Sequence, residues 1–284
     1  MKGRLPDFLI IGGMKCGTTS LYDYLSLHPD IHMTSPKELH FFSLRKFNPE
    51  GLATYKEHFE SDKKVAGSVP QNYTKRHVTE FSGAPGRLYR YCPDIKLIYI
   101  VRDPLDRIYS HYNESQENVK GADSLLASVQ DLDSSHFVQT SRYYYQLSAF
   151  LEYFPPEQML IVATEALHHN RLTTLNQIFE FLHVDKVEDE ALFSFVSNQS
   201  ANKRRITFLG RWMYGPRGAA VRRLIPNQIK NRLSKSAAFQ SAIRAPLKKE
   251  QLPPEVETAI KDYLRPDVEQ LRAFSKNSLS EWDI

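Results

Sequence analysis

The feature that most limits how this chain can fold is an apolar run that leads through a glycine-bearing loop into an amphipathic helix. The run Phe8–Ile11 lies between proline and glycine and predicts a buried strand of a parallel sheet. After the loop, Thr18 or Thr19 is expected to cap a helix whose Leu21 and Leu25 lie four residues apart on one face. Because the N–H groups and the dipole at such a helix start attract negative charge, the stretch predicts a phosphate or sulfate site.

The loop differs from the phosphate loop of nucleotide hydrolases in the residues that matter for catalysis. Gly12 and Gly17 have a similar separation, but a hydrolase carries Lys and then Ser or Thr directly after the second glycine. Here Thr18 follows that glycine, and the lysine is Lys15, two residues before it. The loop is therefore expected to bind the anionic end of a nucleotide without being an ATPase. A tight turn that binds no ligand is the alternative.

Length and cysteine content favour one sizeable intracellular domain. A chain of 284 residues can bury a large core, and α/β folds of this size are often single domains. No apolar run approaches the roughly 20 residues that span a bilayer, and no secretory signal is recognisable, so we expect a soluble, cytoplasmic protein. Cys16 and Cys92 are not spaced as metal ligands, which fits a reducing compartment. Cys16 lies in the loop, and we interpret it as a small filler whose backbone N–H matters more than its thiol.

The positive charge of the chain is concentrated in one segment. The formal net charge is +4, yet residues 201–249 carry 13 of the 37 basic residues and no acidic one. Such a block suits a polyanionic cofactor, an anionic substrate or membrane headgroups, and a solvated surface is the alternative.

A second apolar run, Lys96–Val101, predicts another buried strand, and charged residues follow it. Asp103 can cap the next helix, and Pro104 suits its first turn. Ligands of open α/β sheets gather at the carboxyl ends of strands, where Arg102 stands, and a guanidinium can hold phosphate with two bonds. Ser110, two helical turns on, could add a hydroxyl. A magnesium-binding role for Asp103 fits poorly with its neighbours.

Two loops offer side chains for an acceptor. Lys37, Glu38 and His40 place a cation, a carboxylate and an imidazole just before an aromatic pair. They either line a cleft or form a polar loop beside core aromatics. Asn72 and Tyr73 are candidate acceptor contacts in the second loop, where a generic loop is an equal alternative.

The remaining pattern predicts a parallel sheet covered by helices on both sides. A short strand is expected at Ile31–Met33 and another at Met159–Val162, followed by a helix around Leu172–Phe181. An amphipathic helix opens near Ser141, and its tyrosines are expected in the core rather than as an adenine platform. Strands that alternate with helices in this way indicate an α/β fold.

Three of these stretches resemble one family. The string Lys15-x-Gly17-Thr18-Thr19-x-Leu21 is similar to the 5′-phosphosulfate loop of sulfotransferases that use 3′-phosphoadenosine 5′-phosphosulfate (PAPS). The stretch 101–110 resembles the motif in which the equivalents of Arg102 and Ser110 hold the 3′-phosphate. Residues 37–42 resemble the Lys-Glu-x-His-Phe-Phe stretch of Golgi-type and bacterial carbohydrate sulfotransferases, which implies that Glu38 is the general base. The resemblance implies donor contacts from Lys15, Cys16, Gly17, Thr18, Thr19 and Ser20.

Other parts match the family less well. Ser68 stands where the substrate loop of the relatives usually has an acid, and the following proline is displaced by one, which weakens the case for Asn72 and Tyr73. A Lys/Arg-rich loop closes over the 3′-phosphate in the family, which implies this role for Lys203, Arg204 and Arg205 as a group. A solvated turn is the alternative there. The resemblance covers roughly residues 6–206.

We therefore predict a single sulfotransferase domain over 1–284, with a three-layer P-loop-like fold and a central parallel sheet flanked by helices. The resemblance implies transfer of a sulfuryl group from PAPS to a hydroxyl or amine, with adenosine 3′,5′-bisphosphate as product. We expect a saccharide-like acceptor that Lys37 contacts. Glu38 would take the proton, Lys15 would neutralise the leaving phosphate, and no metal is expected. We expect no nucleic-acid partner, and segment 201–249 is a candidate to cover the acceptor or to contact a membrane peripherally. The alternatives are a P-loop nucleotide kinase and a non-catalytic module for anionic glycans or membranes.

Overall fold

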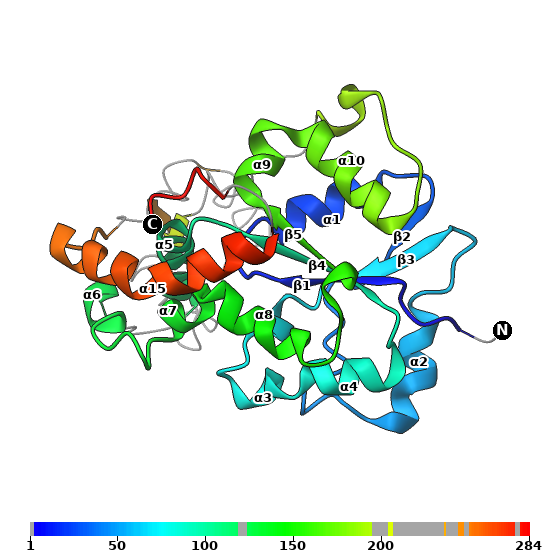
Figure 1. Ribbon diagram of the computed structural model, residues 1–284, viewed down its shortest axis with the longest axis horizontal. Coiled ribbons are helices and arrows are strands. Elements are labelled where there is room, and N and C mark those ends of the chain that lie inside the picture. The colour runs from blue at the N-terminus through cyan, green and yellow to red at the C-terminus, as the bar shows by residue number, and fades with distance from the viewer. Residues whose placement is uncertain are drawn as a thin grey trace. The chain divides into compact units, whose positions relative to one another are not determined.

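A five-stranded parallel sheet lies at the centre of the chain (Figure 1). The computed structural model describes residues 3–118, 124–194, 204–206, 236, 244–246, 250–275 and 279–284. The strand order is β2-β3-β1-β4-β5, and every neighbouring pair is parallel. The strands are β1 (Phe8–Gly12), β2 (Ile31–Met33), β3 (Val65–Ser68), β4 (Lys96–Val101) and β5 (Met159–Ala163).

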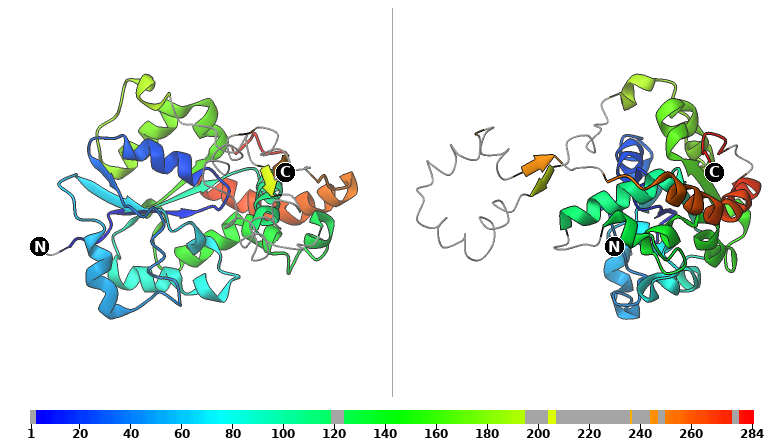
Figure 2. Two further views of the ribbon diagram at one scale, coloured as in Figure 1. Left: turned by 180° about the vertical axis from the view of Figure 1, so that it is seen from behind. Right: turned by 90° about the vertical axis from the view of Figure 1, so that its left-hand side faces the viewer.

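Helices cover both faces of this sheet, which confirms the predicted α/β arrangement. The helices α1 (Thr18–Ser26), α9 (Thr164–His169) and α10 (Arg171–Leu182) lie on one face (Figures 1 and 2). The other face is covered by α4 (Ala84–Tyr91) and α8 (Tyr143–Leu151), and α15 (Pro254–Ser275) packs along α8. The other described helices are α2 (Leu52–Glu57), α3 (Thr79–Ser82), α5 (Pro104–Asn118), α6 (Leu125–Ser128) and α7 (His136–Ser141), with short 3₁₀ turns at Pro49–Gly51, Gln71–Thr74, Pro156–Gln158 and Glu190–Phe193.

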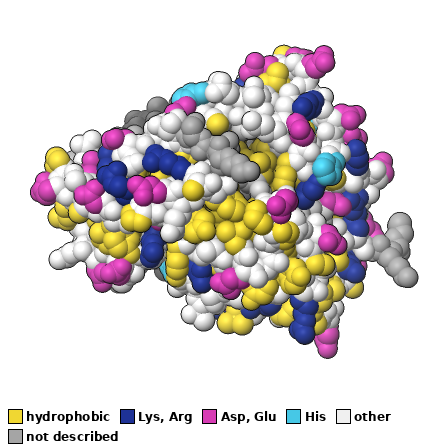
Figure 3. Space-filling view, in the orientation of Figure 1, with side chains coloured by type: hydrophobic (Ala, Val, Ile, Leu, Met, Phe, Trp, Pro, Cys, Tyr) yellow, Lys and Arg dark blue, Asp and Glu magenta, His cyan; other side chains and the backbone are white. Residues whose placement is uncertain are grey.

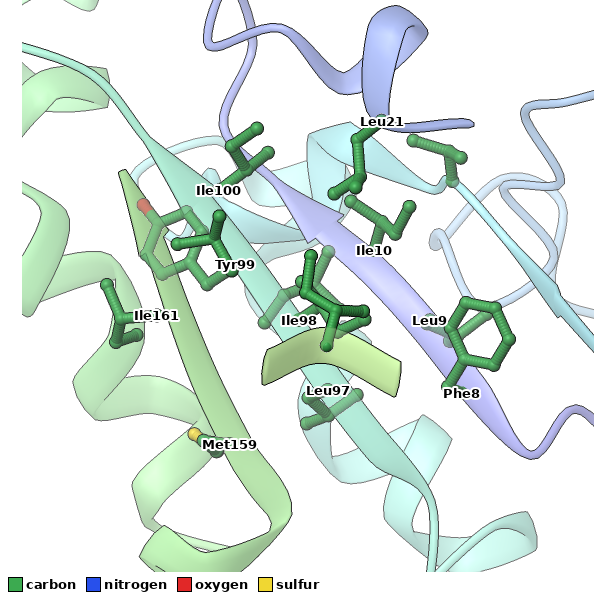
Figure 4. Close-up of a cluster of buried hydrophobic side chains, with 14 of the residues drawn as sticks. Phe8, Leu9, Ile10, Leu21, Leu97, Ile98, Tyr99, Ile100, Met159 and Ile161 are labelled. Atoms are coloured by element: carbon green, nitrogen blue, oxygen red, sulfur yellow. The ribbon is translucent and has the colours of Figure 1, made fainter. Parts of the chain in front are cut away.

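The core is built around the two central strands. All five residues of β1 are buried, as are the last five of β4. Figure 4 shows buried side chains of β1, β4 and β5, with Leu21 of α1 next to Ile10 of β1. Gly67 of β3 pairs with Phe8, and a Cβ at Gly67 would lie 2.4 Å from the Phe8 ring, so only glycine fits there. Burial on both sides explains why these strands read as unbroken apolar runs.

The contact pattern groups the chain into two compact units. The first comprises residues 1–111, 126–197 and 252–284, and it contains the parallel sheet. The second comprises 112–125 and 198–251; here β6 (Arg204–Ile206) and β7 (Arg244–Pro246) form an antiparallel pair. Within it, Glu250 accepts hydrogen bonds from the Tyr112 hydroxyl at 2.9 Å and from the backbone N–H of Leu125 at 2.8 Å. That the whole chain acts as a single domain stays a prediction.

The described surface carries charges of both signs. In the view of Figure 3, basic and acidic side chains are interspersed, and apolar side chains gather near α8. Most of the basic segment 201–249 lies outside the described residues. Among the described helices none combines the length and apolarity of a membrane span. In the same ranges, no three His, Cys, Asp or Glu side chains are grouped as metal ligands.

Candidate active site

The glycine-bearing loop after β1 is fastened to the ends of two neighbouring strands. The Gly13 N–H donates to the Ile100 carbonyl at 2.5 Å. Thr164 is the residue after β5, and its hydroxyl oxygen lies 2.6 Å from the carbonyl oxygen of Cys16 and 2.8 Å from the carbonyl oxygen of Val101. The loop is therefore held at the carboxyl edge of the sheet, where ligands of open α/β folds bind. Thr164 was not identified from the sequence, although it stands only two residues after the predicted strand Met159–Val162.

The start of α1 corrects one prediction. The N-cap residue is Gly17 rather than Thr18 or Thr19, and its φ of 84° lies in the left-handed region that favours glycine. Lys15 also has a positive φ, 70°, within the same loop. Gly17 has no side chain that could accept hydrogen bonds from the N–H groups at the start of α1. These N–H groups can therefore donate to a bound anion.

The Cys16 thiol is buried and uncharged. Its Sγ atom is buried 3.5 Å from the Tyr143 hydroxyl oxygen. Burial raises the pKa of the thiol to about 11, so the sulfur is neutral near pH 7. The buried, neutral sulfur agrees with the interpretation of Cys16 as a small filler, and its backbone N–H donates to the Gly13 carbonyl at 3.1 Å.

Arg102 stands at the end of β4, next to the start of α5. Asp103 caps that helix as predicted, because its Oδ1 accepts from the Asp106 N–H at 3.0 Å. The Arg102 guanidinium lies 2.7 Å from an Asp106 carboxylate oxygen, and both side chains are partly exposed. Ser110 is partly buried two turns along α5. The two residues of the predicted 3′-phosphate pair are therefore placed by α5, with Arg102 just before its first residue and Ser110 about two turns inside it.

Two side chains from other elements hold the backbone at Arg102 and Asp103. The Tyr143 hydroxyl donates to the Arg102 carbonyl at 2.8 Å. The Glu165 Oε1 atom accepts from the Asp103 N–H at 3.0 Å. Tyr143 is fully buried, so the expectation that it belongs to the core is confirmed. Neither supporting role was predicted, since each joins residues more than 40 positions apart.

Glu38 is the centre of a hydrogen-bonded cluster. Gln71 Nε2 donates to Glu38 Oε1 at 2.8 Å, and His40 Nε2 lies 3.3 Å from Oε2. Lys37 Nζ lies 3.5 Å from Oε1. The hydrogen bond with His40, and then the charge of Lys37, lower the pKa of the Glu38 carboxyl against the opposing effect of burial. Glu38 is therefore a carboxylate at neutral pH.

The same cluster is joined to the start of α1 by two bridges. Lys37 Nζ donates to the Thr19 hydroxyl at 2.8 Å, and the Thr18 hydroxyl donates to Gln71 Oε1 at 3.2 Å. Each bridge runs from the Glu38 carboxylate through one side chain to one of the first two residues of the helix. The structure thus brings together the predicted base and the predicted anion loop, which are 19 or more residues apart in sequence.

The other acceptor candidates have different outcomes. Asn72 lies in the cluster, with its Nδ2 3.4 Å from His40 Nε2. Tyr73 does not face this site: its ring is buried, and its hydroxyl accepts from the Phe42 N–H at 2.7 Å. The apolar neighbours of Tyr73 explain this position in the core. Lys203 lies outside the described residues, and Arg204 and Arg205 are described only as backbone of β6.

A positive region lies on the Met14 side of the loop. Lys75 is buried, and its Nζ donates to the Met14 Sδ atom at 3.2 Å. Arg107 is fully buried and donates to His111 Nδ1 at 3.3 Å, which requires a neutral imidazole. Burial and the charges of Arg107 and Lys75 lower the pKa of His111 to about 2. The positive charge beside the loop therefore comes from lysine and arginine side chains, and His111 adds none near neutral pH.

Comparisons with known proteins agree on one family. The family model described as "Sulfotransferase domain" matches residues 5–208. A human bifunctional heparan sulfate N-deacetylase/N-sulfotransferase 3 is 31% identical over 206 residues, covering 64% of this chain and 22% of that protein. A mouse heparan sulfate glucosamine 3-O-sulfotransferase 3B1 is 31% identical over 199 residues, covering 68% of this chain and 50% of that protein. The chain thus spans half or less of the length of these two relatives.

A solved structure shows the same fold. The sulfotransferase from Alicyclobacillus acidocaldarius superposes with a TM-score of 0.66 and 21% sequence identity. The match covers 99% of this chain and 100% of that one. The expected P-loop-like sulfotransferase fold is confirmed by this likeness.

Proposed function

This chain belongs to the sulfotransferase domain family, and we propose that it moves a sulfuryl group from PAPS to a hydroxyl or amine of a carbohydrate acceptor. One observation carries the proposal beyond the family match. The Glu38 carboxylate is bridged through Lys37 and Gln71 to the first two residues of α1, where the anion loop ends. A fixed base beside an anion-binding helix start is the arrangement that transfer from an anionic donor to a weakly acidic acceptor needs.

The loop and its surroundings fit the donor chemically. The helix start has no side-chain cap from its N-cap glycine, and the 5′ end of the donor carries negative charge that such a start favours. Lys15 lies in the loop, Lys75 adds positive charge beside Met14, and the charge of Arg107 acts on Cys16 of the loop. Arg102, at the next strand end, would hold the 3′-phosphate with two bonds. When bound, the donor supplies the sulfuryl group and a phosphate as the leaving group.

The residues around Glu38 prepare it to accept a proton. With its pKa lowered, Glu38 is ionised before the acceptor arrives, so it needs no prior deprotonation. Its hydrogen bonds from Gln71 and His40 fix both carboxylate oxygens, which limits the reorganisation required during transfer. Lys15 would neutralise charge that develops on the departing phosphate oxygen. As in phosphoryl transfer, positioning and charge stabilisation would supply most of the rate enhancement.

The acceptor proposal draws on the relatives and on charge. One relative named above is an N-sulfotransferase and the other a glucosamine 3-O-sulfotransferase, so both amine and hydroxyl acceptors are compatible with this family. The basic segment 201–249 suits an anionic glycan, since it contains 13 basic residues and no acidic one. We propose an acidic saccharide as the first acceptor class to test.

Transfer of radiolabelled sulfate from PAPS tests the proposal directly. The acceptor panel contains heparosan, its N-deacetylated form, a phenol and a lipid alcohol, and the variant is Glu38→Gln. We expect transfer to one of the saccharides and a loss of about 10²- to 10⁴-fold in turnover for the variant. The exposed Glu50→Gln serves as the matched control and should keep full activity. Transfer to the phenol or lipid alone would overturn the acceptor class, and full activity of Glu38→Gln would overturn the assigned base.

The kinase alternative has no support beyond the fold. A P-loop kinase would carry lysine directly after Gly17, where this chain has Thr18. Membership in the sulfotransferase family accounts for the same loop with Lys15 inside it.

A further inference from the structure

The last described segment of the chain, residues 279–284, is fastened beside the candidate active site. It lies beyond the family match, which ends at residue 208. Arg272 of α15 donates to three of its carbonyls: Ile284 at 2.9 Å, Leu279 at 3.1 Å and Trp282 at 3.0 Å. The side chains of Leu279, Trp282 and Ile284 are all buried. The segment is therefore held in a defined conformation by its own helix.

Trp282 makes the contact that matters for the site. Its indole Nε1–H donates to Glu165 Oε2 at 3.2 Å, and Glu165 uses its other oxygen, Oε1, to accept from the Asp103 N–H. The indole ring also lies with its centroid 5.8 Å from that of Tyr143, whose hydroxyl donates to the Arg102 carbonyl. Trp282 thus contacts both side chains that hold the backbone of Arg102 and Asp103.

This arrangement gives the indole N–H a specific task. A carboxylate with one oxygen bonded to a backbone N–H can still rotate about its side-chain torsions, and a donor at the second oxygen restricts that motion. Only 3% of the Trp282 surface is exposed, so water does not readily replace its N–H. Glu165 in turn fixes the peptide from which the Arg102 side chain leaves.

We propose that Trp282 is a positioning residue for the 3′-phosphate of the donor, acting through Glu165 and the Arg102–Asp103 peptide. The proposal rests on the proposed function, because it assumes that Arg102 holds this phosphate. It extends the donor site to a segment that shares no sequence motif with the phosphate loops.

The test compares two ligands that differ by the 3′-phosphate. Binding of adenosine 3′,5′-bisphosphate and of AMP is measured by calorimetry on the full chain and on Trp282→Phe, which keeps an aromatic ring and removes the N–H. We expect the dissociation constant for the bisphosphate to rise about tenfold, as for loss of one hydrogen bond to a charged group, with less than a twofold change for AMP. The exposed Glu281→Gln in the same segment, whose partner is His169 on the surface, should change neither.

A purely structural role would give a different result. Equal weakening for both ligands, or no change for either, would overturn the proposal. If Trp282→Phe does not fold, Glu165→Gln is judged by the same ratio, since it alters the same link from its other side. Failure of the unmodified chain to bind the bisphosphate would instead refute the proposed function, so the two failures are distinguishable.

Discussion

Replacement of Arg102 by alanine tests the assignment of the 3′-phosphate site. In the structure the Arg102 guanidinium pairs with Asp106, four residues on, and the two side chains are 31% and 60% exposed. Such an exposed pair on a helix contributes about 0.3–0.5 kcal/mol, so little is lost when Arg102 exchanges Asp106 for a phosphate. A charge-assisted bond to phosphate contributes about 1.5–3 kcal/mol.

The difference between these two energies sets the expected effect. A net loss of about 2 kcal/mol corresponds to roughly 30-fold weaker binding of adenosine 3′,5′-bisphosphate by Arg102→Ala. AMP, which lacks the 3′-phosphate, should bind the variant and the unmodified chain within about threefold. Calorimetry without magnesium measures both ligands and ATP.

A matched control separates the site from general electrostatics. Arg265→Ala removes an arginine of α15 that is 48% exposed and pairs with Asp262 at 3.0 Å, so it changes the net charge equally. It should leave both affinities unchanged. Preference for ATP over the bisphosphate, with binding indifferent to Arg102, would refute both the phosphate assignment and the reasoning from charge.

Two further predictions concern the base and the acid stability of the fold. Gln71→Ala removes a hydrogen bond to Glu38 and should lower turnover about tenfold in the sulfate-transfer assay, while calorimetry shows donor affinity within twofold of the unmodified chain. The exposed Gln251→Ala serves as the control and should match the unmodified chain in both measurements. Equal turnover of Gln71→Ala and the unmodified chain would exclude the Gln71 bridge from catalysis. The pKa of His111 is about 2 in the folded chain and about 6.5 in the unfolded chain, so the unfolded state takes up the proton first as the pH falls. His111 therefore lowers the free energy of unfolding by about 2 kcal/mol as the pH falls from 6.5 to 5. Urea unfolding at these two pH values should show a smaller loss of unfolding free energy for His111→Gln than for the unmodified chain. An equal loss in both proteins would contradict a neutral, buried His111 imidazole.

The strands and the cap of α5 could be predicted because their signals are local. The sequence run Lys96–Val101 has the same bounds as β4, since burial on both faces demands apolar side chains at every position. Asp103 could be identified as a helix cap from its place before Pro104. Such features depend on residues that are neighbours in the chain, so they can be recognised from a single sequence.

The start of α1 shows where a local rule gave the wrong residue. Thr18 and Thr19 are good capping residues, and a cap was expected from them. The structure instead uses their hydroxyls for Gln71 and Lys37, and Gly17 ends the loop. A side-chain cap would occupy N–H groups at the helix start, and the glycine N-cap leaves them available to the anion proposed to bind there.

The supports of the site were beyond sequence reasoning because each is one bond between distant residues. Asp267 of α15 accepts from the N–H groups of Tyr144 at 2.9 Å and Tyr145 at 2.8 Å, and so fixes the first turn of α8, which carries Tyr143. Trp282 reaches Glu165 across 117 positions. Neither contact repeats along the chain, and neither leaves a periodic pattern that could be recognised. Since both converge on the residues that hold Arg102, the region after residue 252 supports the proposed donor site, even though the family match ends at residue 208.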